Sequence, residues 1–390
     1  MPPVESASER VPFEQVRDLL HVGHPLPFRV LDAQARLLLN AGQMLTGEAM
    51  FDGLVERGAW AELADVMAER ARRDGDATRA AASAVPPPTL FDRWEKLLWQ
   101  FDVLMRALVR HSARREDVVA FHSKLSALVE RDADVALFHC VRHDDQRFAL
   151  YPLTHAIHCA VVTMLTGRKL GYSEAKVVST ACAALTMNVS ILELQAVMAE
   201  QDTEPTSRQR AQIRAHPEAS VQLLRAAGVD DLDWLATVAQ HHERTDGKGY
   251  PLGQVEVCDT AHLLHAADVY MAKISPRAKR PPMAASQAGR QLFQERGGDV
   301  LAMSLVKSMG VHPPGSLVQL KSGEVAVVIR RPASGPHPLV ATLSDARGQP
   351  SSHTLRRDTA QAEFAIQGPV QHAHPFARVL PERVYGVIAG

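Results

Sequence analysis

The chain has 390 residues, of which 46% are hydrophobic and 22% charged, and its formal net charge is −1. This length suits two or three domains, and the composition is ordinary for a globular protein with a large core. A charge near zero gives no overall basic field, which argues against nucleic acid as the partner. Because the N-terminus lacks a signal-peptide pattern and no run approaches ~18 uncharged apolar residues, we expect a cytoplasmic protein without a membrane span.

Residues 1–71 are predicted to form a small α+β domain. Phe28 and Val30 alternate with polar neighbours, Leu37 and Leu39 lie in a second apolar run, and residues 32–34 between them can turn, which predicts a β-hairpin. Residues 72–89 are rich in Ala, Arg, Asp and Pro and predict a linker. The four cysteines form no CxxC pair, which predicts reduced thiols in a cytosolic protein.

Apolar residues then recur at three- and four-residue steps, which predicts helices. We expect a helical lead-in over 90–144 and an all-helical bundle over 145–312. After residue 313 the pattern changes to short alternating runs around a Lys-Ser-Gly-Glu turn, so residues 313–390 are predicted to form a β module and tail. The predicted fold class is mainly α, with a small domain containing strands at each end.

Residues 241–251 read His-His-Glu-Arg-Thr-Asp-Gly-Lys-Gly-Tyr-Pro. A predicted helix runs into His241 and His242, and adjacent side chains in a helix diverge by about 100°. One cation is therefore an awkward shared target for both imidazoles, whereas two metals, or one metal and a substrate, suit them better. A bare histidine pair would more often cap a helix end. The glycines that follow let the backbone turn sharply or approach a ligand, and the length of the full string favours a site.

This string matches HHExxDGxGYP at every fixed position, and residues 145–312 resemble the HD-GYP family of metal-dependent phosphohydrolases, which hydrolyse cyclic di-GMP. The resemblance implies an HD-type helical bundle, a divalent cation (Fe, Mn or another metal) as cofactor, and cyclic di-GMP or a related nucleotide as ligand. It also implies that the loop after the histidine pair contacts substrate, through Asp246, Gly247, Gly249, Tyr250 and Pro251.

The resemblance further assigns five metal ligands, which are His155, His216, His241, His242 and Asp268. The family often has a glutamate four residues before the first of these, where this chain has Tyr151. Two cations of the loop after the last ligand, Arg277 and Arg280, are predicted to bind phosphate, with a solvated basic loop as an equal alternative. We expect His158 to be a packed helical residue rather than a ligand. His262 and His265 are expected to be incidental, with a supporting role behind the ligands as the alternative.

The signature dipeptide of the family is replaced in this chain. Met187 stands where the family has histidine, Asn188 where it has aspartate, and Ile191 where it has lysine. A thioether is a soft ligand, an amide oxygen carries no charge to balance dications, and an apolar side chain cannot steady a phosphate. Reduced metal occupancy is therefore predicted.

Two functions follow as hypotheses. The first is an HD-GYP-like phosphodiesterase with impaired or altered hydrolysis, in which His216, His241 and His242 hold one cation and Asn188 is a weak fourth donor. The second is a catalytically silent signalling module that binds cyclic di-GMP, or docks a protein partner, through the loop from Asp246 to Pro251. The retained loop beside a replaced dipeptide fits either hypothesis.

Overall fold

The computed structural model describes residues 10–76, 88–142, 147–278, 280–351, 353–370 and 381–386. Most of the predicted linker, Lys279 and parts of the C-terminal tail lie outside the described residues. The chain divides into two compact units. Of the described residues, the first unit comprises 10–76, 88–103 and 147–150, and the second comprises 104–142 and those from 151 to 386.

The first unit contains a four-stranded antiparallel sheet in the order β1-β4-β2-β3. The predicted hairpin is present, because β2 pairs with β3, and the Asp32 side chain accepts the backbone N–H groups of Gln34 and Arg36 in its turn. The strands and helices of this unit are β1 (Arg10–Pro12), η1 (Phe13–Leu19), β2 (Val30–Leu31), β3 (Leu37–Leu39), α1 (Glu48–Glu56), β4 (Trp60–Glu62), α2 (Leu63–Asp76) and η2 (Phe148–Leu150).

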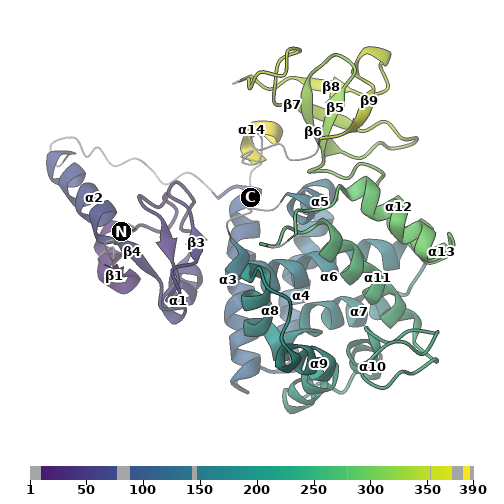
Figure 1. Ribbon diagram of the computed structural model, residues 1–390. Helices are drawn as coiled ribbons and strands as arrows, with labels where there is room; N and C mark the ends of the chain where they lie inside the picture. Colours follow the sequence, from purple (N-terminus) through teal and green to yellow (C-terminus); the bar gives the residue numbers. More distant parts are fainter. Residues whose placement is uncertain are drawn as a thin grey trace, which may run out of the picture. The chain divides into compact units, whose positions relative to one another are not determined.

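Helices make up most of the second unit, and the predicted mainly α fold class is confirmed (Figure 1). The helix α3 (Leu90–Val109) runs from the first unit into the second. The other helices are α4 (Arg115–Arg131), α5 (Ala133–Val141), α6 (Tyr151–Lys169), α7 (Glu174–Thr186), η3 (Val189–Ile191), α8 (Leu192–Glu200), α9 (Ser207–Ala226), α10 (Leu232–Gln240), α11 (Asp259–Ile274), α12 (Ala285–Glu295) and α13 (Val300–Met309).

Helix α6 lies at the centre of this bundle, packed against α5, α7, α8, α11 and α13 (Figure 1). It is buried on almost every face, as expected for a helix that is apolar all round. By length and composition alone, Phe148–Lys169 and Glu174–Glu200 would suit a membrane span, but 83% and 67% of their most apolar windows are buried within the protein. Core helices of soluble proteins meet the same criterion, so this observation is weak evidence for a membrane span.

A five-stranded antiparallel sheet follows the helices, in the order β8-β7-β6-β5-β9. Its core is built from Val318, Leu320, Ala326, Val328 and Val340. Ion pairs join it to α5, because Arg331 lies 2.5 Å from Asp134 and Arg330 lies 3.0 Å from Asp132. Its elements are β5 (Leu317–Leu320), β6 (Val325–Arg330), β7 (Leu339–Thr342), β8 (Arg356–Asp358), η4 (Ala362–Phe364), β9 (Ile366–Pro369) and the short helix α14 (Pro381–Tyr385).

Candidate metal centre

The histidine pair lies at the end of α10. The Asp231 carboxylate caps the start of this helix by accepting the Trp234 N–H at 2.9 Å, and the helix ends at Gln240. His241 and His242 therefore occupy a turn, and their ring centroids are only 4.1 Å apart. The expectation that the two imidazoles diverge is wrong, because it assumed that both histidines lie inside a helix. Helix α10 ends at Gln240, one residue before His241.

Three imidazoles converge at this turn. His216 on α9 joins His241 and His242, and one ring nitrogen from each lies within 4.8 Å of the others. The Nδ1 atoms of His216 and His241 contact the carbonyls of Ile213 and Val238 at 2.6 and 2.7 Å. Because a carbonyl only accepts, both Nδ1 atoms must carry the proton, and each neutral ring keeps a lone pair on Nε2.

The two Nε2 atoms of His216 and His241 face each other at 3.1 Å. Two lone pairs at this distance repel unless a positive centre lies between or beside them. A ring N–H donated to a backbone carbonyl, with the other nitrogen free, is also the usual arrangement of a metal-ligating histidine. The residues present therefore fit a divalent cation.

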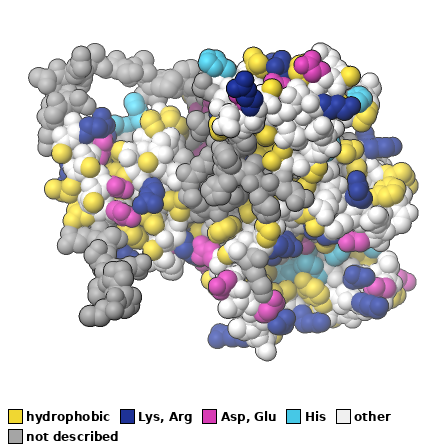
Figure 2. Space-filling model, turned by 45° about the horizontal axis from the view of Figure 1, so that its top comes forward, with side chains coloured by type: hydrophobic (Ala, Val, Ile, Leu, Met, Phe, Trp, Pro, Cys, Tyr) yellow, Lys and Arg dark blue, Asp and Glu magenta, His cyan; other side chains and the backbone are white. Residues whose placement is uncertain are grey.

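Burial keeps these histidines neutral. It lowers the pKa of His216 to about 3, with the charge of His241 adding to the effect, and it lowers the pKa of His241 to about 4. The pKa of His242 is also held well below its usual value, first by burial and then by His241. Neutral imidazole is the form that binds metal. Figure 2 shows a recessed group of histidine side chains with Lys and Arg side chains around it.

These shifts predict that the metal-free protein loses stability on acidification. The unfolded chain takes up protons at His216 and His241 as pH falls below about 6.5, and the folded chain does not until about pH 4. Within this window each histidine lowers the free energy of unfolding by ~1.4 kcal/mol per pH unit. Urea unfolding between pH 7 and 4.5 after chelation measures the slope. We expect His216→Gln to reduce it by ~1.4 kcal/mol per pH unit, and an unchanged slope would contradict the assignment.

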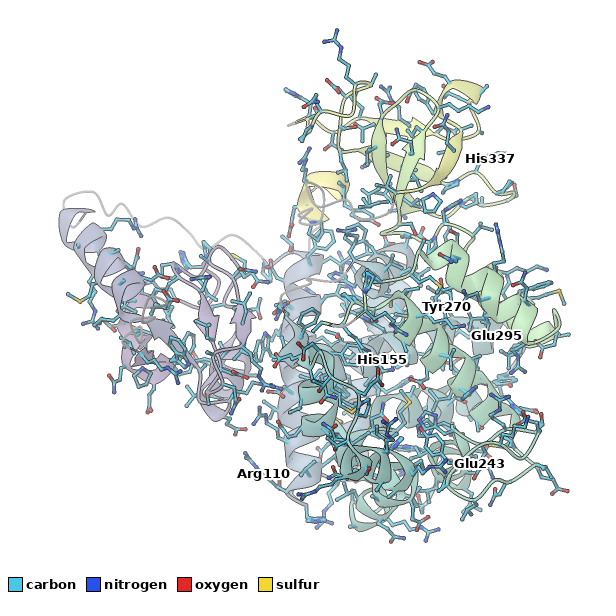
Figure 3. All side chains as sticks on the ribbon, viewed as in Figure 1. Arg110, His155, Glu243, Tyr270, Glu295 and His337 are labelled. Carbon is cyan, nitrogen blue, oxygen red and sulfur yellow. The ribbon has the colours of Figure 1, made fainter. Side chains whose placement is uncertain are left out.

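A second group of potential ligands lies on α6 and α11. His155 Nε2 is 2.7 Å from Asp268 Oδ1, and Cys159 joins them one helical turn after His155. Burial opposes ionisation of Asp268, but His155, His242 and His241 together hold the pKa of its carboxyl below the usual range. Figure 3 shows His155 in the interior of the bundle.

Cys159 is a member of this group that sequence reasoning missed. Its four-residue spacing from His155 was the available signal. Burial raises the pKa of the Cys159 thiol well above its usual value, with Asp268 adding to the effect, so the side chain is a thiol at neutral pH. Because the thiolate is the metal-binding form, Cys159 is a poor ligand in this setting.

Of the predicted phosphate-binding arginines, the structure brings Arg277 to this second group. Its Nη2 donates to the hydroxyl of Tyr151, which stacks on His155 with ring centroids 5.2 Å apart. Its Nε is buried and has no hydrogen-bond partner among the described residues. Arg280 is exposed and donates to the carbonyl of Ala272.

A buried carboxylate holds the loop after the histidine pair. Glu243 is 2% exposed and accepts the backbone N–H groups of Leu252 and Gln254 at 2.7 and 3.0 Å. Figure 3 shows it at the base of this loop. Glu243 was not predicted as a functional residue, although it is a fixed position of the 241–251 string. It shapes the loop and does not belong to the ligand cluster.

The other loop residues divide into two roles. Tyr250 stacks on His242 with ring centroids 4.5 Å apart, and its N–H donates to the His242 carbonyl, so it contacts the ligand cluster directly. The bond from Tyr250 to Pro251 is cis. Asp246 is exposed and pairs with Arg244 at 2.7 Å, while Gly247 has a φ of +69°. These two residues form the turn itself.

The replaced dipeptide lies at the end of α7, just before a segment that contacts α9. Met187 is fully buried at the end of α7, Asn188 is 5% exposed, and Ile191 is half-buried. Ser190 Oγ donates to the backbone carbonyl of His216 at 3.1 Å, which fixes this segment against α9. His265, expected to be incidental, contacts the His241 carbonyl through Nδ1 at 2.8 Å and so holds the backbone of a candidate ligand.

Comparisons with known proteins match the helical part of the chain that contains these residues. Residues 134–300 match the family described as HD domain. The chain is 25% identical over 185 residues to a cyclic di-GMP phosphodiesterase of Pseudomonas aeruginosa, covering 46% of this chain and 45% of that protein. It is 22% identical over 194 residues to cyclic di-GMP phosphodiesterase PdeB of Borreliella burgdorferi, covering 48% of this chain and 51% of that protein.

The chain thus spans about half the length of these curated relatives. A solved structure described as an HDG"Y"P protein from Bdellovibrio bacteriovorus aligns with a TM-score of 0.45 and 14% identity, covering 73% of this chain and 94% of that one. Residues 134–300 thus match an HD domain, and the complete 241–251 string lies within that match.

Proposed function

We propose that this chain is a metal-dependent cyclic di-GMP phosphodiesterase whose hydrolysis is slowed by the replaced dipeptide. The convergence of the imidazoles of His216, His241 and His242, with two Nε2 lone pairs facing each other, is the observation that supports it. The substrate is carried over from the names of the two curated relatives. We place the protein in the cytoplasm, in keeping with its four free cysteines.

The three histidines would hold one divalent cation, and Fe is among the metals that imidazole ligands suit. Such a cation supplies Lewis-acid polarisation of a phosphoryl oxygen. The chain itself supplies the surroundings. Arg277 Nε, buried without a partner among the described residues, is the donor we assign to a phosphate oxygen. Tyr250, which stacks on His242, would form a wall against a base.

Slow hydrolysis follows from the charges that the cluster lacks. Asn188 brings a neutral amide where a carboxylate would balance a cation, and Met187 brings a soft thioether. Asp268, the carboxylate of the second group, is already hydrogen-bonded to His155. We therefore propose reduced occupancy of the metal and a lower rate, rather than a different reaction.

A second function is favoured by the loop. Leu252 and Val255 are 74% and 59% exposed next to a loop that Glu243 holds in place. Exposed apolar side chains on an ordered loop suit a protein partner. The alternative proposal is therefore a silent signalling module that docks a protein, or binds cyclic di-GMP without cleaving it, through residues 246–251.

Hydrolysis of cyclic di-GMP distinguishes the two proposed functions. Purified full-length chain is incubated with cyclic di-GMP and Mn(II) or Fe(II), and the linear dinucleotide is quantified by chromatography. We expect slow product formation that His241→Ala combined with His242→Ala abolishes, with His337→Ala as a matched histidine control in the β module. If the wild type and the double variant turn over equally, the activity does not come from this site. If neither turns over while the nucleotide still binds, the alternative function stands.

A further inference from the structure

Two side chains of the second ligand group, His155 and Asp268, form a hydrogen-bonded series with Tyr151 and Arg277. Arg277 Nη2 donates to the Tyr151 hydroxyl, which lies 3.4 Å from His155 Nδ1. His155 Nε2 then contacts Asp268 Oδ1 at 2.7 Å. The guanidinium carbon of Arg277 lies 4.8 Å from the Tyr151 ring centroid, and that ring is stacked on His155 with 20° between the planes.

The donors and acceptors of this series follow in one order. A guanidinium only donates and an ionised carboxylate only accepts. Tyr151 O accepts from Arg277, and the hydroxyl proton of Tyr151 faces His155 Nδ1. His155 then carries its proton on Nε2 and donates it to Asp268. Both ring nitrogens of His155 are engaged.

The charges in this series also oppose the binding of a divalent cation at His155 and Asp268. The series has a cation at Arg277 and an anion at Asp268, so it is neutral as it stands. A divalent ion bound by His155 and Asp268 would displace the Nε2 proton and face the guanidinium across one tyrosine ring, with Cys159 present as an uncharged thiol. The arginines recorded beside the first group lie at the exposed surface: Arg214 is 5.9 Å from the Tyr250 ring centroid, and Arg244 pairs with Asp246.

We propose that Tyr151 and Arg277 close the second metal position, so that this chain binds at most one divalent cation, at His216, His241 and His242. The inference rests on the proposed metal-dependent function and specifies its stoichiometry. Tyr151 and Arg277 are positioning residues here: they hold His155 and Asp268 as a hydrogen-bonded pair. The same arginine thereby takes the place of a second cation beside the substrate position.

Manganese content of the full-length chain tests the closure. Each protein is equilibrated with excess Mn(II), desalted and measured by inductively coupled plasma mass spectrometry, with folding checked by circular dichroism. We expect no more than one manganese per wild-type chain, its loss in His241→Ala, and its retention in His155→Gln. Two manganese ions in the wild type, one of them lost in His155→Gln, would overturn the closure. No manganese in the wild type would instead contradict the proposed metal centre.

A variant designed to restore the second metal position provides a second test. Tyr151→Glu with Arg277→Ala adds a carboxylate and removes the competing cation, and we expect it to gain a second manganese. Each single change serves as its matched control. Tyr151→Glu alone should gain none, because Arg277 pairs with the new carboxylate, and Arg277→Ala alone should gain none, because no carboxylate is added. A second manganese in Tyr151→Glu alone would contradict the role of Arg277. If the double variant does not fold, the His155→Gln result decides.

Discussion

Replacing Met187 by histidine together with Asn188 by aspartate is expected to raise metal occupancy to one full equivalent and to tighten binding about 10–100-fold, the scale on which groups around a metal site act. The reason is charge, because the three histidines that would hold the cation are neutral. The dipeptide is buried, and Ser190 holds its segment against the backbone of His216. By our assignment of the dipeptide to the site, a carboxylate at position 188 would add an anionic oxygen beside the cluster.

Manganese titration followed by electron paramagnetic resonance measures this change. Met187→Leu, which keeps the volume and adds no ligand, is the control for disturbed packing. Asn188→Asp alone separates the effect of charge from that of the added imidazole. If the double change leaves affinity where it was, residues 187 and 188 do not face the cluster, and our placement of the replaced dipeptide fails. Cyclic di-GMP turnover, measured alongside, should rise in the double variant.

Gly249→Ala is expected to displace the loop after the histidine pair and to destabilise the protein. A β-carbon at this position would lie 2.5 Å from the Arg244 backbone nitrogen, 2.5 Å from Glu243 Cα and 2.6 Å from the His242 carbonyl oxygen. All three are backbone atoms, so no side chain can move aside. Overpacking costs ~1–3 kcal/mol, and a clash with backbone belongs at the upper end of that range.

The loop offers graded controls for this change. Gly247→Ala meets nothing closer than 3.6 Å but imposes a φ of +69° on alanine, a strain of ~1–2 kcal/mol. Lys248→Ala changes an exposed side chain and should be nearly neutral. Chemical unfolding should therefore rank Gly249→Ala as most destabilising and Lys248→Ala as least. Metal affinity should follow the same rank, because Tyr250 leaves His242 when the loop moves. An unchanged midpoint for Gly249→Ala would contradict the tight packing at this glycine.

Much of the architecture was predictable from local patterns. Helical periodicity depends on neighbours three and four residues apart, so the mainly α class and the hairpin around Asp32 followed from the chain alone. The 241–251 string likewise indicated candidate ligands, because it is a contiguous motif. The replacement of the signature dipeptide by Met187 and Asn188 was visible in the sequence for the same reason.

The arrangement of those residues was decided by the tertiary structure. Because α10 ends at Gln240, the rings of His241 and His242 lie close together. From the sequence alone they are expected to diverge, as adjacent side chains in a helix do. The hydrogen-bonded series from Arg277 to Asp268 joins residues more than a hundred positions apart, and no spacing rule encodes that contact. Periodicity determines which face of a helix is buried. Only the packing of α6 against α11 determines which side chains meet on that face, and so which histidines stay free for a cation.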